Sequence, residues 1–211
     1  MRFKVIILDF DGVLVESNEI KDKAFEHVFA AYPQHLPAIL EYHRRTSLIR
    51  FGKFRHIYEN ILRRPYTPQD EQRLGAEFSK YCIEQVVLCP WVKGAPQFLK
   101  FFKGRVPMYI ASINPPQDME AILKARGIDG YFEKVYTVTA DKSGALKEVL
   151  ARHNAVGTEA VFIGDSNGDA GSARKAGVFF MGRNSGLDLK AGDFPVFDDM
   201  LKVLEYLQKA T

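Results

Sequence analysis

"ILDFDGVLVES" (residues 7–17) begins as an apolar strand and then places two carboxylates, Asp9 and Asp11, one residue apart. Side chains two positions apart on an extended strand point to the same side. Like charges in that arrangement repel each other unless a cation lies between them or one of them holds a proton. Taken alone, the pair could equally be two hydrated acids in a loop, so its meaning depends on the rest of the chain.

The composition is that of an ordinary globular protein. The chain has 211 residues, 46% hydrophobic and 26% charged, and this length fits one large domain or one domain carrying a smaller insertion. A formal charge of +3 without a basic and aromatic stripe argues against a nucleic-acid partner. The N-terminal apolar run is soon interrupted by acids, and no other segment approaches spanning length, so we expect neither a secretion signal nor a membrane partner. Two cysteines, Cys82 and Cys89, are too few for a disulfide framework, and as reduced thiols they fit a cytoplasmic protein.

Short β-branched or aromatic runs predict the strands, at residues 3–10, 106–112, 134–138, 160–165 and 178–182. Apolar residues at helical spacing predict helices over residues 116–126, 143–154 and 169–176. The strands are continuous apolar runs, which is typical of a parallel sheet covered on both faces. The sequence therefore predicts an α/β fold with a Rossmann-like three-layer core.

Residues 17–90 interrupt this alternation with several helical patterns and no convincing strand. The clearest helix covers residues 67–87, with Thr67 as N-cap, Pro68 at the first helical position and Asp70 completing a capping box. We therefore expect a core domain of residues 1–16 and 91–211 and an inserted helical domain of residues 17–90.

Polar residues follow four of the predicted strands, and ligands of open parallel sheets lie beyond the carboxyl ends of the strands. The set comprises Asp9 and Asp11, Ser112, Lys142, and Asp165 with Asp169. Each has an ordinary explanation alone, as a helix cap, a hydrated lysine or a turn, but no packing rule places them together at these ends. Phosphoryl transfer needs a nucleophile, a divalent cation and donors for the equatorial oxygens. A carboxylate can be that nucleophile, and two or three carboxylates suffice as the protein's share of a Mg²⁺ site.

These motifs resemble those of the haloacid dehalogenase (HAD) superfamily, in the branch that holds phosphoglycolate phosphatase and β-phosphoglucomutase. "DFDGVLVES" is similar to the first motif, DxDGxxxDS, and "GDSNGD" (164–169) matches the fourth, GDSxxD, while Ser112 and Lys142 fall where the second and third motifs are expected. The chain departs from the family at Glu16, where many relatives carry Asp. It departs again at "DKSGAL" (141–146), where many have Lys-Pro, so Lys142 is the best candidate for the third motif, with Lys147 a little more than one helical turn further on.

The resemblance implies a role for each position. Asp9 would be the nucleophile and a Mg²⁺ ligand, and Asp11 the general acid and then the base, with its backbone carbonyl on the metal. Asp165 would bind Mg²⁺ directly and Asp169 would support the waters of the metal. The remaining expected contacts are to the transferring phosphate, from Ser112, Lys142, Gly12 and Ile113, and to the rest of the substrate, from Asn114.

The inserted helical domain resembles the cap of this family, which closes over the active site and excludes water. Residues 42–66 contain seven Lys or Arg residues against one acid, Glu59. They are either a hydrated basic face or, at Arg50 and Lys53, groups that face the cleft and attract an anionic substrate. We expect His43 and His56 to be surface or core residues and not metal ligands.

The expected function is that of a Mg²⁺-dependent phosphatase, which hydrolyses a small phosphorylated metabolite, a sugar phosphate or a phospho-acid, through an aspartyl phosphate. A 2-haloacid dehalogenase is disfavoured, because that chemistry uses a lone nucleophilic Asp without a metal. A phosphomutase of the β-phosphoglucomutase type shares the same core and is not separated from a phosphatase by the sequence. A non-catalytic binding protein on this fold would predict the loss of a catalytic carboxylate, and none is lost. The identity of the substrate and the oligomeric state are left open.

Overall fold

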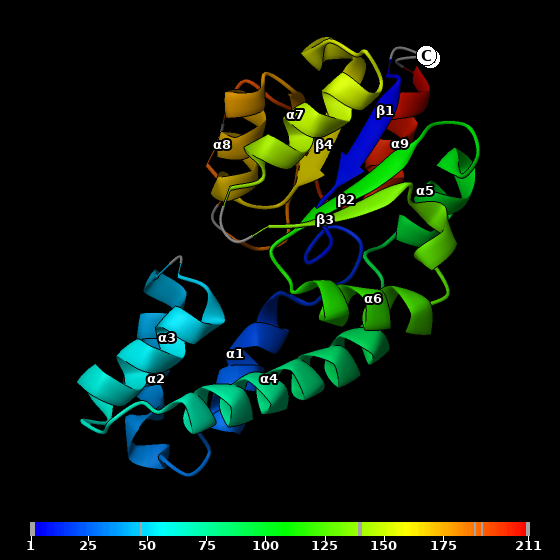
Figure 1. The fold of residues 1–211 in the computed structure, drawn as a ribbon. Coiled ribbons are helices and arrows are strands. Elements are labelled where there is room, and N and C mark those ends of the chain that lie inside the picture. The colour runs from blue at the N-terminus through cyan, green and yellow to red at the C-terminus, as the bar shows by residue number, and fades with distance from the viewer. Residues whose placement is uncertain (1–2, 47, 139–140, 188, 191, 210–211) are drawn as a thin grey trace. The chain divides into compact units, whose positions relative to one another are not determined.

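The computed structural model describes residues 3–46, 48–138, 141–187, 189–190 and 192–209. The chain divides into two compact units (Figure 1). We call Met1–Ser17 with Cys89–Thr211 the core unit, and Asn18–Leu88 the cap unit. Each is described by itself below.

The core unit is built on a six-stranded sheet in which every pairing is parallel. In chain order the strands are β1 (Val5–Leu8), β2 (Met108–Ser112), β3 (Lys134–Thr137), β4 (Ala160–Gly164), β5 (Phe179–Arg183) and β6 (Val196–Phe197). The spatial order β3-β2-β1-β4-β5-β6 places β1 between β2 and β4. The polar residues that follow these three strands therefore belong to neighbouring strand ends. Strand β6 was not predicted, because its two residues are too short to show a periodicity.

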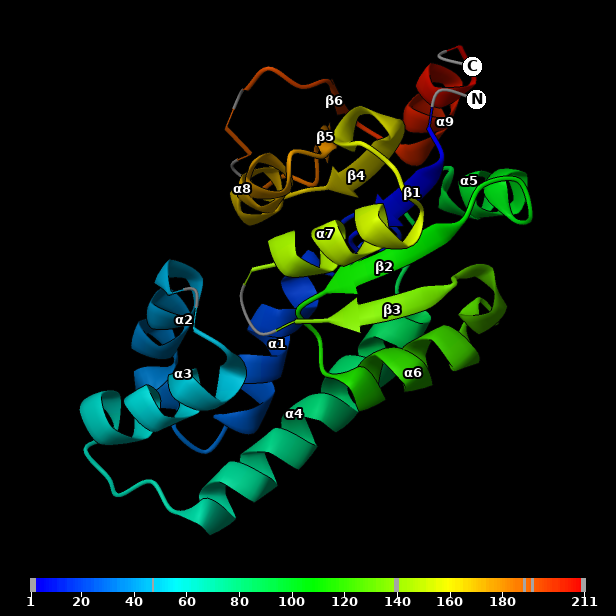
Figure 2. The same ribbon diagram turned by 45° about the horizontal axis from the view of Figure 1, so that its top comes forward.

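Both faces of the sheet are covered, as the continuous apolar runs predicted. All residues of β1, β2 and β4 are buried. Figures 1 and 2 show α7 (Ser143–Arg152) and α8 (Asn167–Ala176) on one side of the sheet, with α5 (Ala95–Phe102) and α9 (Met200–Lys209) on the other. The core unit also contains α6 (Pro116–Ala125) and the 3-10 turns η3 (Asp129–Tyr131) and η4 (Gly157–Glu159). The Rossmann-like three-layer prediction is confirmed.

Alternate residues of β1 pack into different layers, because successive side chains on a strand point to opposite faces. Val5 and Ile7 lie in one apolar cluster with Leu146 of α7 and Phe162 of β4. The central strands are thereby fixed in position, and the loops that follow them start from a rigid support.

Within its described residues, the cap unit consists of helices joined by turns and loops, with no strand. Its elements are α1 (Asn18–Val28), η1 (Pro33–His35), α2 (Leu36–Arg45), α3 (Arg50–His56), the π-helix η2 (Ile57–Ile61) and α4 (Pro68–Leu88). Phe25, Phe29, Phe54 and Phe78 form its aromatic centre.

The first turn of α4 has the predicted capping box. Thr67 N–H donates to Asp70 Oδ2 and Asp70 N–H donates to Thr67 Oγ1, both at 3.2 Å. Two otherwise unpaired backbone donors at the start of the helix are thereby satisfied, which explains why α4 begins where the sequence places it.

The chain leaves and re-enters the core unit through two segments that pair with each other. Glu16 N–H donates to the carbonyl of Pro90 at 2.9 Å, and Val92 N–H donates to the carbonyl of Leu14 at 3.0 Å. An antiparallel bridge joins Val15 to Trp91. The insertion therefore begins and ends at neighbouring points of the core unit.

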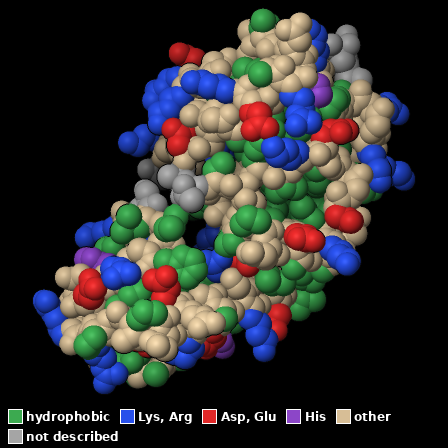
Figure 3. All heavy atoms as spheres, in the orientation of Figure 1, with side chains coloured by type: hydrophobic (Ala, Val, Ile, Leu, Met, Phe, Trp, Pro, Cys, Tyr) green, Lys and Arg blue, Asp and Glu red, His purple; other side chains and the backbone are tan. Residues whose placement is uncertain are grey.

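Charged side chains of both signs are interspersed over the face of the molecule shown in Figure 3. Within the part of the chain that the structure describes, none of the helices combines the length and the apolar character needed to cross a membrane.

Candidate active site

Asp9 stands directly after β1, and the end of the strand fixes its position. Its N–H donates to the carbonyl of Ile163 on β4 at 2.8 Å. Its carboxylate is buried, with Oδ1 accepting from Phe10 N–H at 2.7 Å and Oδ2 lying 2.8 Å from Lys142 Nζ. The residue expected to be the nucleophile therefore has one oxygen on a backbone donor and the other on an ammonium.

Asp169 lies in the first turn of α8 and is held from several sides. Its Oδ1 is 2.7 Å from Lys142 Nζ. Its Oδ2 accepts from the N–H and the hydroxyl of Ser166, at 3.2 and 2.6 Å, and from Asp165 N–H at 3.3 Å. Because both of its oxygens accept hydrogen bonds, the Asp169 carboxylate is fixed in place and can orient the groups around it.

The first residue of "GDSNGD", Gly164, has no room for a side chain. A Cβ at Gly164 would lie 2.5 Å from Asp169 Cβ and 2.7 Å from its Cγ, which are distances that real Cβ atoms do not adopt. Only glycine lets the Asp169 carboxylate approach the end of β4 this closely. The first and last letters of the motif are therefore coupled through space.

Asp9, Asp165 and Asp169 form a buried group of carboxylates that could hold a metal ion. One oxygen from each lies within 4.8 Å of the others. Mg²⁺ prefers hard oxygen ligands and usually keeps several waters, so these donors fit that ion.

Burial governs the electrostatics of the site. Desolvation raises the pKa of the Asp9 carboxyl to about 8, with Lys142 opposing the rise and Asp169 and Asp165 adding to it. Burial also lowers the pKa of the Lys142 ammonium, but Asp9 and Asp169 more than offset this and hold its pKa above the usual value. Because one ammonium faces three acids, the cluster has a deficit of positive charge, which a divalent cation would correct.

Asp11, on the loop after β1, is fixed by a donor on each oxygen. The hydroxyl of Ser17 donates to Oδ1, and Asn114 Nδ2 donates to Oδ2 at 2.8 Å. Asn114 N–H in turn donates to Ser112 Oγ at 3.1 Å, so the ends of β1 and β2 are tied together. Sequence reasoning gave no role to Ser17, although its place at the end of the first motif was a usable signal.

The residues expected to contact the phosphate lie at the ends of β1 and β2 and at the start of α7. Lys142 reaches the acids, whereas Lys147 is exposed on α7. Ser112 is buried at the end of β2, and Ile113, the next residue, is 51% exposed. Gly12 has φ 68°, a left-handed conformation that favours glycine, and its N–H donates to the carbonyl of Val15 at 2.9 Å. The phosphate-binding roles of these residues stay predictions.

Arg50 and Lys53, which we expected to meet the substrate, are both anchored within the cap unit. Arg50 Nη1 donates to Ser79 Oγ at 2.8 Å. Lys53 is buried, and its ammonium donates to the carbonyl of His43 at 2.9 Å and lies 2.9 Å from His43 Nδ1. Burial lowers the pKa of Lys53 to about 8 and that of His43 to about 4, so the imidazole is neutral and can accept from the ammonium. Their contact with a substrate stays a prediction.

Other basic residues of residues 42–66 fit the hydrated-face interpretation. Arg44 lies 2.7 Å from Asp22 and Arg45 lies 2.9 Å from Glu41, with both arginine side chains more than half exposed. Such pairs contribute little to stability.

Sequence reasoning missed Arg183, the last residue of β5. It is buried, its Nη1 and Nη2 donate to the two carboxylate oxygens of Glu16 at 2.9 and 2.6 Å, and Nη1 also donates to the carbonyl of Gly12 at 3.1 Å. The rule that strand ends converge would have pointed to it, because it closes the fifth strand. Arg183 fastens the loop that carries Asp11.

Solved structures share this fold over nearly their whole length. A protein from Haemophilus somnus described as a predicted phosphoglycolate phosphatase has a TM-score of 0.80 at 17% identity, covering 99% of both chains. A candidate β-phosphoglucomutase from Thermotoga maritima has a TM-score of 0.74 at 19% identity, covering 99% of this chain and 100% of that one. The HAD-type hydrolase candidate YfnB from Bacillus subtilis, bound to magnesium, has a TM-score of 0.73 at 14% identity, covering 98% and 99%. At these identities the likeness shows the fold alone.

The curated proteins contain no match to this chain. The sequence profile of the haloacid dehalogenase-like hydrolases matches residues 3–177, well over half of the chain. That span includes all four motif positions, from Asp9 to Asp169. The chain therefore belongs to the haloacid dehalogenase-like hydrolase family.

Proposed function

We propose that the protein is a Mg²⁺-dependent phosphatase that hydrolyses a small phosphorylated metabolite through an aspartyl phosphate on Asp9. The observation that carries the proposal is the position of Lys142, whose ammonium lies 2.8 Å from Asp9 and 2.7 Å from Asp169 inside a buried group of three acids. A nucleophilic carboxylate, a fixed cation and a set of metal-binding oxygens are the parts that phosphoryl transfer requires.

In the first half of the reaction, an oxygen of Asp9 attacks phosphorus and the ester oxygen leaves. Asp11 gives its proton to that oxygen, and Ser17 and Asn114 hold its carboxyl group in place. Lys142 and Ser112 donate to the equatorial oxygens of the phosphoryl group, joined by backbone donors near Gly12 and Ile113.

In the second half, Asp11 accepts a proton from water as that water attacks the aspartyl phosphate. Inorganic phosphate leaves and Asp9 is regenerated. A Mg²⁺ ion held by Asp9, Asp165 and the Asp11 carbonyl, with Asp169 supporting its waters, would supply the positive charge that the three acids and the phosphate lack.

We propose that Arg50 and Lys53 recognise a second anionic group on the substrate, a carboxylate or another phosphate. Within the described residues, the ammonium of Lys53 makes two contacts, both with His43. An ammonium has three N–H donors, so one is left for a ligand. Asn114, beside Asp11, would contact the leaving part of the substrate.

A panel of phosphorylated sugars, acids and nucleotides tests the function. With Mg²⁺, wild-type protein should release inorganic phosphate from a subset of the panel, and Asp9→Asn should release none above background. Conversion of one sugar phosphate into its isomer without phosphate release would identify a phosphomutase instead. Tight binding of a panel member without any turnover would favour the non-catalytic binding protein.

A further inference from the structure

The backbone of Lys142 has a conformation that a proline at the next position would disfavour. Lys142 is the N-cap of α7, with φ −81° and ψ −8°, which is the right-handed helical region. A proline at the next position disfavours that region for the residue before it. This chain has Ser143 at that position, and side-chain contacts hold the segment instead.

Asp141 and Ser172 provide these contacts. Asp141 Oδ1 accepts from Ser143 N–H at 2.8 Å and lies 3.1 Å from Ser172 Oγ, whose single proton is shared between this carboxylate and the carbonyl of Gly168 at 2.9 Å. Lys142 N–H donates to Ser172 Oγ at 3.2 Å, and Ser172 is buried. The amide of Lys142 and the carboxylate of Asp141 thus both contact Ser172 on α8, and Ser143 is tied to Asp141.

That same helix also holds the other end of the lysine. Asp169, three residues before Ser172 on α8, accepts from Lys142 Nζ at 2.7 Å. Residues three apart on a helix are neighbours on its surface. The backbone and the ammonium of Lys142 therefore both contact residues of α8. Asp9, which follows β1, contacts the same ammonium.

We propose that Asp141 and Ser172 are positioning residues, which hold the backbone of Lys142 so that its ammonium lies between Asp9 and Asp169. The catalytic part of this inference rests on the proposed function, whereas the placement of the ammonium does not.

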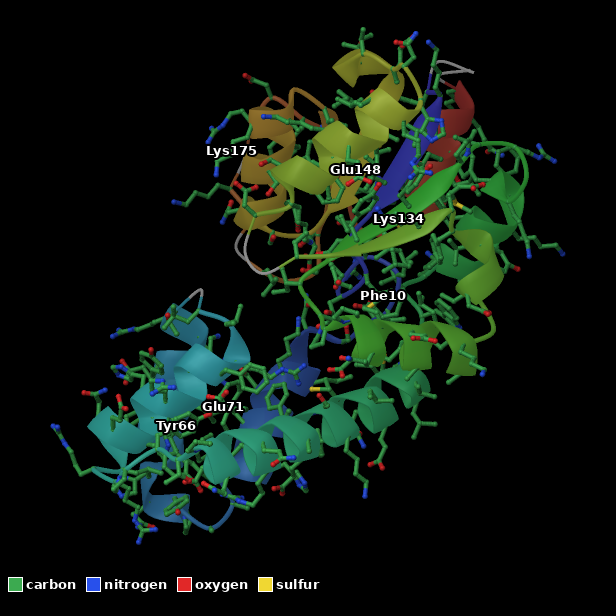
Figure 4. All side chains as sticks on the ribbon, viewed as in Figure 1. Phe10, Tyr66, Glu71, Lys134, Glu148 and Lys175 are labelled. Carbon is green, nitrogen blue, oxygen red and sulfur yellow. The ribbon has the colours of Figure 1, made fainter. Side chains whose placement is uncertain are left out.

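The two oxygens of Asp141 have different duties. Oδ1 makes the contacts to Ser143 and Ser172, whereas Oδ2 lies 2.7 Å from the ammonium of Lys175, whose side chain is 63% exposed. Figure 4 labels Lys175 on α8. An exposed pair of this kind contributes little. Asp141→Asn keeps an Oδ1 acceptor and loses the ion pair with Lys175, and Lys175→Gln loses only that ion pair. Asp141→Ala loses the ion pair and the contacts to Ser143 and Ser172.

Steady-state kinetics separate these variants. Asp141→Ala and Ser172→Ala should lower kcat/KM by roughly tenfold to a hundredfold, the cost of a misplaced group in an active site. Asp141→Asn and Lys175→Gln should stay within about fivefold of wild type. In a Lys142→Met background, Asp141→Ala should have no further effect, because the residue it positions is gone. Equal losses in Asp141→Asn and Asp141→Ala, or full additivity with Lys142→Met, would overturn the proposal.

A second measurement does not depend on activity. Lys142 in the wild type, enclosed by two acids, should resist reductive methylation by formaldehyde and borane, with mass spectrometry as the readout. Asp141→Ala and Ser172→Ala should expose it to labelling, and Asp141→Asn and Lys175→Gln should not. If wild type hydrolyses no phosphate ester but this labelling pattern holds, the proposed function fails and the positioning inference stands. Equal protection in all variants would refute the inference itself.

Ser143→Pro restores the dipeptide common in relatives and tests the same point if Asp141→Ala fails to fold. We expect this variant to lose activity and to expose Lys142 to methylation, since proline opposes the backbone conformation of Lys142. Unchanged protection and activity in Ser143→Pro would remove the need for Asp141.

Discussion

Arg183 holds both carboxylate oxygens of Glu16, at 2.6 and 2.9 Å, and so joins the end of β5 to the loop that follows β1. The arginine side chain is 8% exposed and that of Glu16 is 40% exposed. Bidentate pairs of this geometry are stronger than single-point contacts. The acid that departs from the usual family motif is thus paired with a partner of its own.

Breaking this pair from either side should have unequal effects. Glu16→Gln leaves a buried guanidinium without its counter-charge and should lower the free energy of unfolding by about 1–3 kcal/mol. Arg183→Met removes the buried charge and leaves a half-exposed acid that water can solvate, so its cost should be smaller. Urea unfolding of both variants checks the order, and a larger loss in Arg183→Met would contradict it.

Asp9→Asn should preserve the fold and abolish turnover, because an amide cannot accept the phosphoryl group as a carboxylate does. We expect kcat to fall by about 10⁴-fold or more, as for loss of other catalytic nucleophiles. Beryllium fluoride or aluminium fluoride should bind at Asp9 in the wild type and not in the variant. Turnover by Asp9→Asn near the wild-type rate would exclude the covalent mechanism.

Removal of divalent metal should abolish activity, since Asp9, Asp165, Asp169 and a bound phosphate would concentrate negative charge around one ammonium. Mg²⁺ added after excess EDTA should restore the rate. Ca²⁺ should inhibit, because its longer bonds and higher coordination number relax the in-line geometry. Full phosphate release in EDTA would rule out a metal requirement.

Substitutions at Arg50 and Lys53 should affect substrates unequally. A charge-assisted hydrogen bond is worth roughly 1.5–3 kcal/mol, so Arg50→Ala or Lys53→Met should lower kcat/KM by about tenfold to a hundredfold on the true substrate. Neither should much affect p-nitrophenyl phosphate, which has no second anion. Arg45→Ala, in the exposed pair with Glu41, is the matched control and should change neither. Equal losses on both substrates would instead assign Arg50 and Lys53 to cap structure.

The partly buried His43 should make the cap unit sensitive to acid. Its pKa falls from 6.5 to about 4 through burial and the nearby charge of Lys53, with Asp22 opposing the change. An unfolded His43 binds a proton below pH 6.5 while the folded one stays neutral until about pH 4, so stability is complete above pH 6.5 and is lost as the pH falls towards 4. The loss should reach about 3 kcal/mol.

Hydrogen exchange of α2 and α3 amides between pH 7 and pH 4 measures this effect, after correction for the intrinsic pH dependence of exchange. His43→Gln should flatten the remaining dependence of exchange on pH. His56, whose ring is stacked on Tyr42, provides the control variant His56→Gln. A slope unchanged in His43→Gln would assign the acid sensitivity to other groups.

The parts of the fold that sequence could predict are those with a local cause. Continuous apolar runs identified the five longer strands, and the capping box at Thr67 identified the start of α4, because both are short-range patterns. Strand β6 has two residues and carries no such pattern.

The candidate site was predictable where a motif concentrates chemistry in adjacent letters, as at Asp9 and Asp169. The pairings that support the site were not predictable, because they form between segments far apart in the sequence. The contacts of Arg183 with Glu16 and of Asp141 with Ser172 depend on the order of the strands in the sheet. No spacing in the sequence predicts either contact. The sequence also could not show that Lys53 would be buried against His43.

The pairing of Leu14–Glu16 with Pro90–Val92 also bears on how such a protein can change over evolutionary time. The chain enters and leaves the inserted helices next to these paired segments, and within the described residues none of the strand pairings of the sheet lies in the insertion. An insertion with adjacent ends can be lengthened, shortened or exchanged for another without altering the strand order. The inserted helices and the sheet could then diverge at different rates within one chain, with the paired segments as the point of recombination.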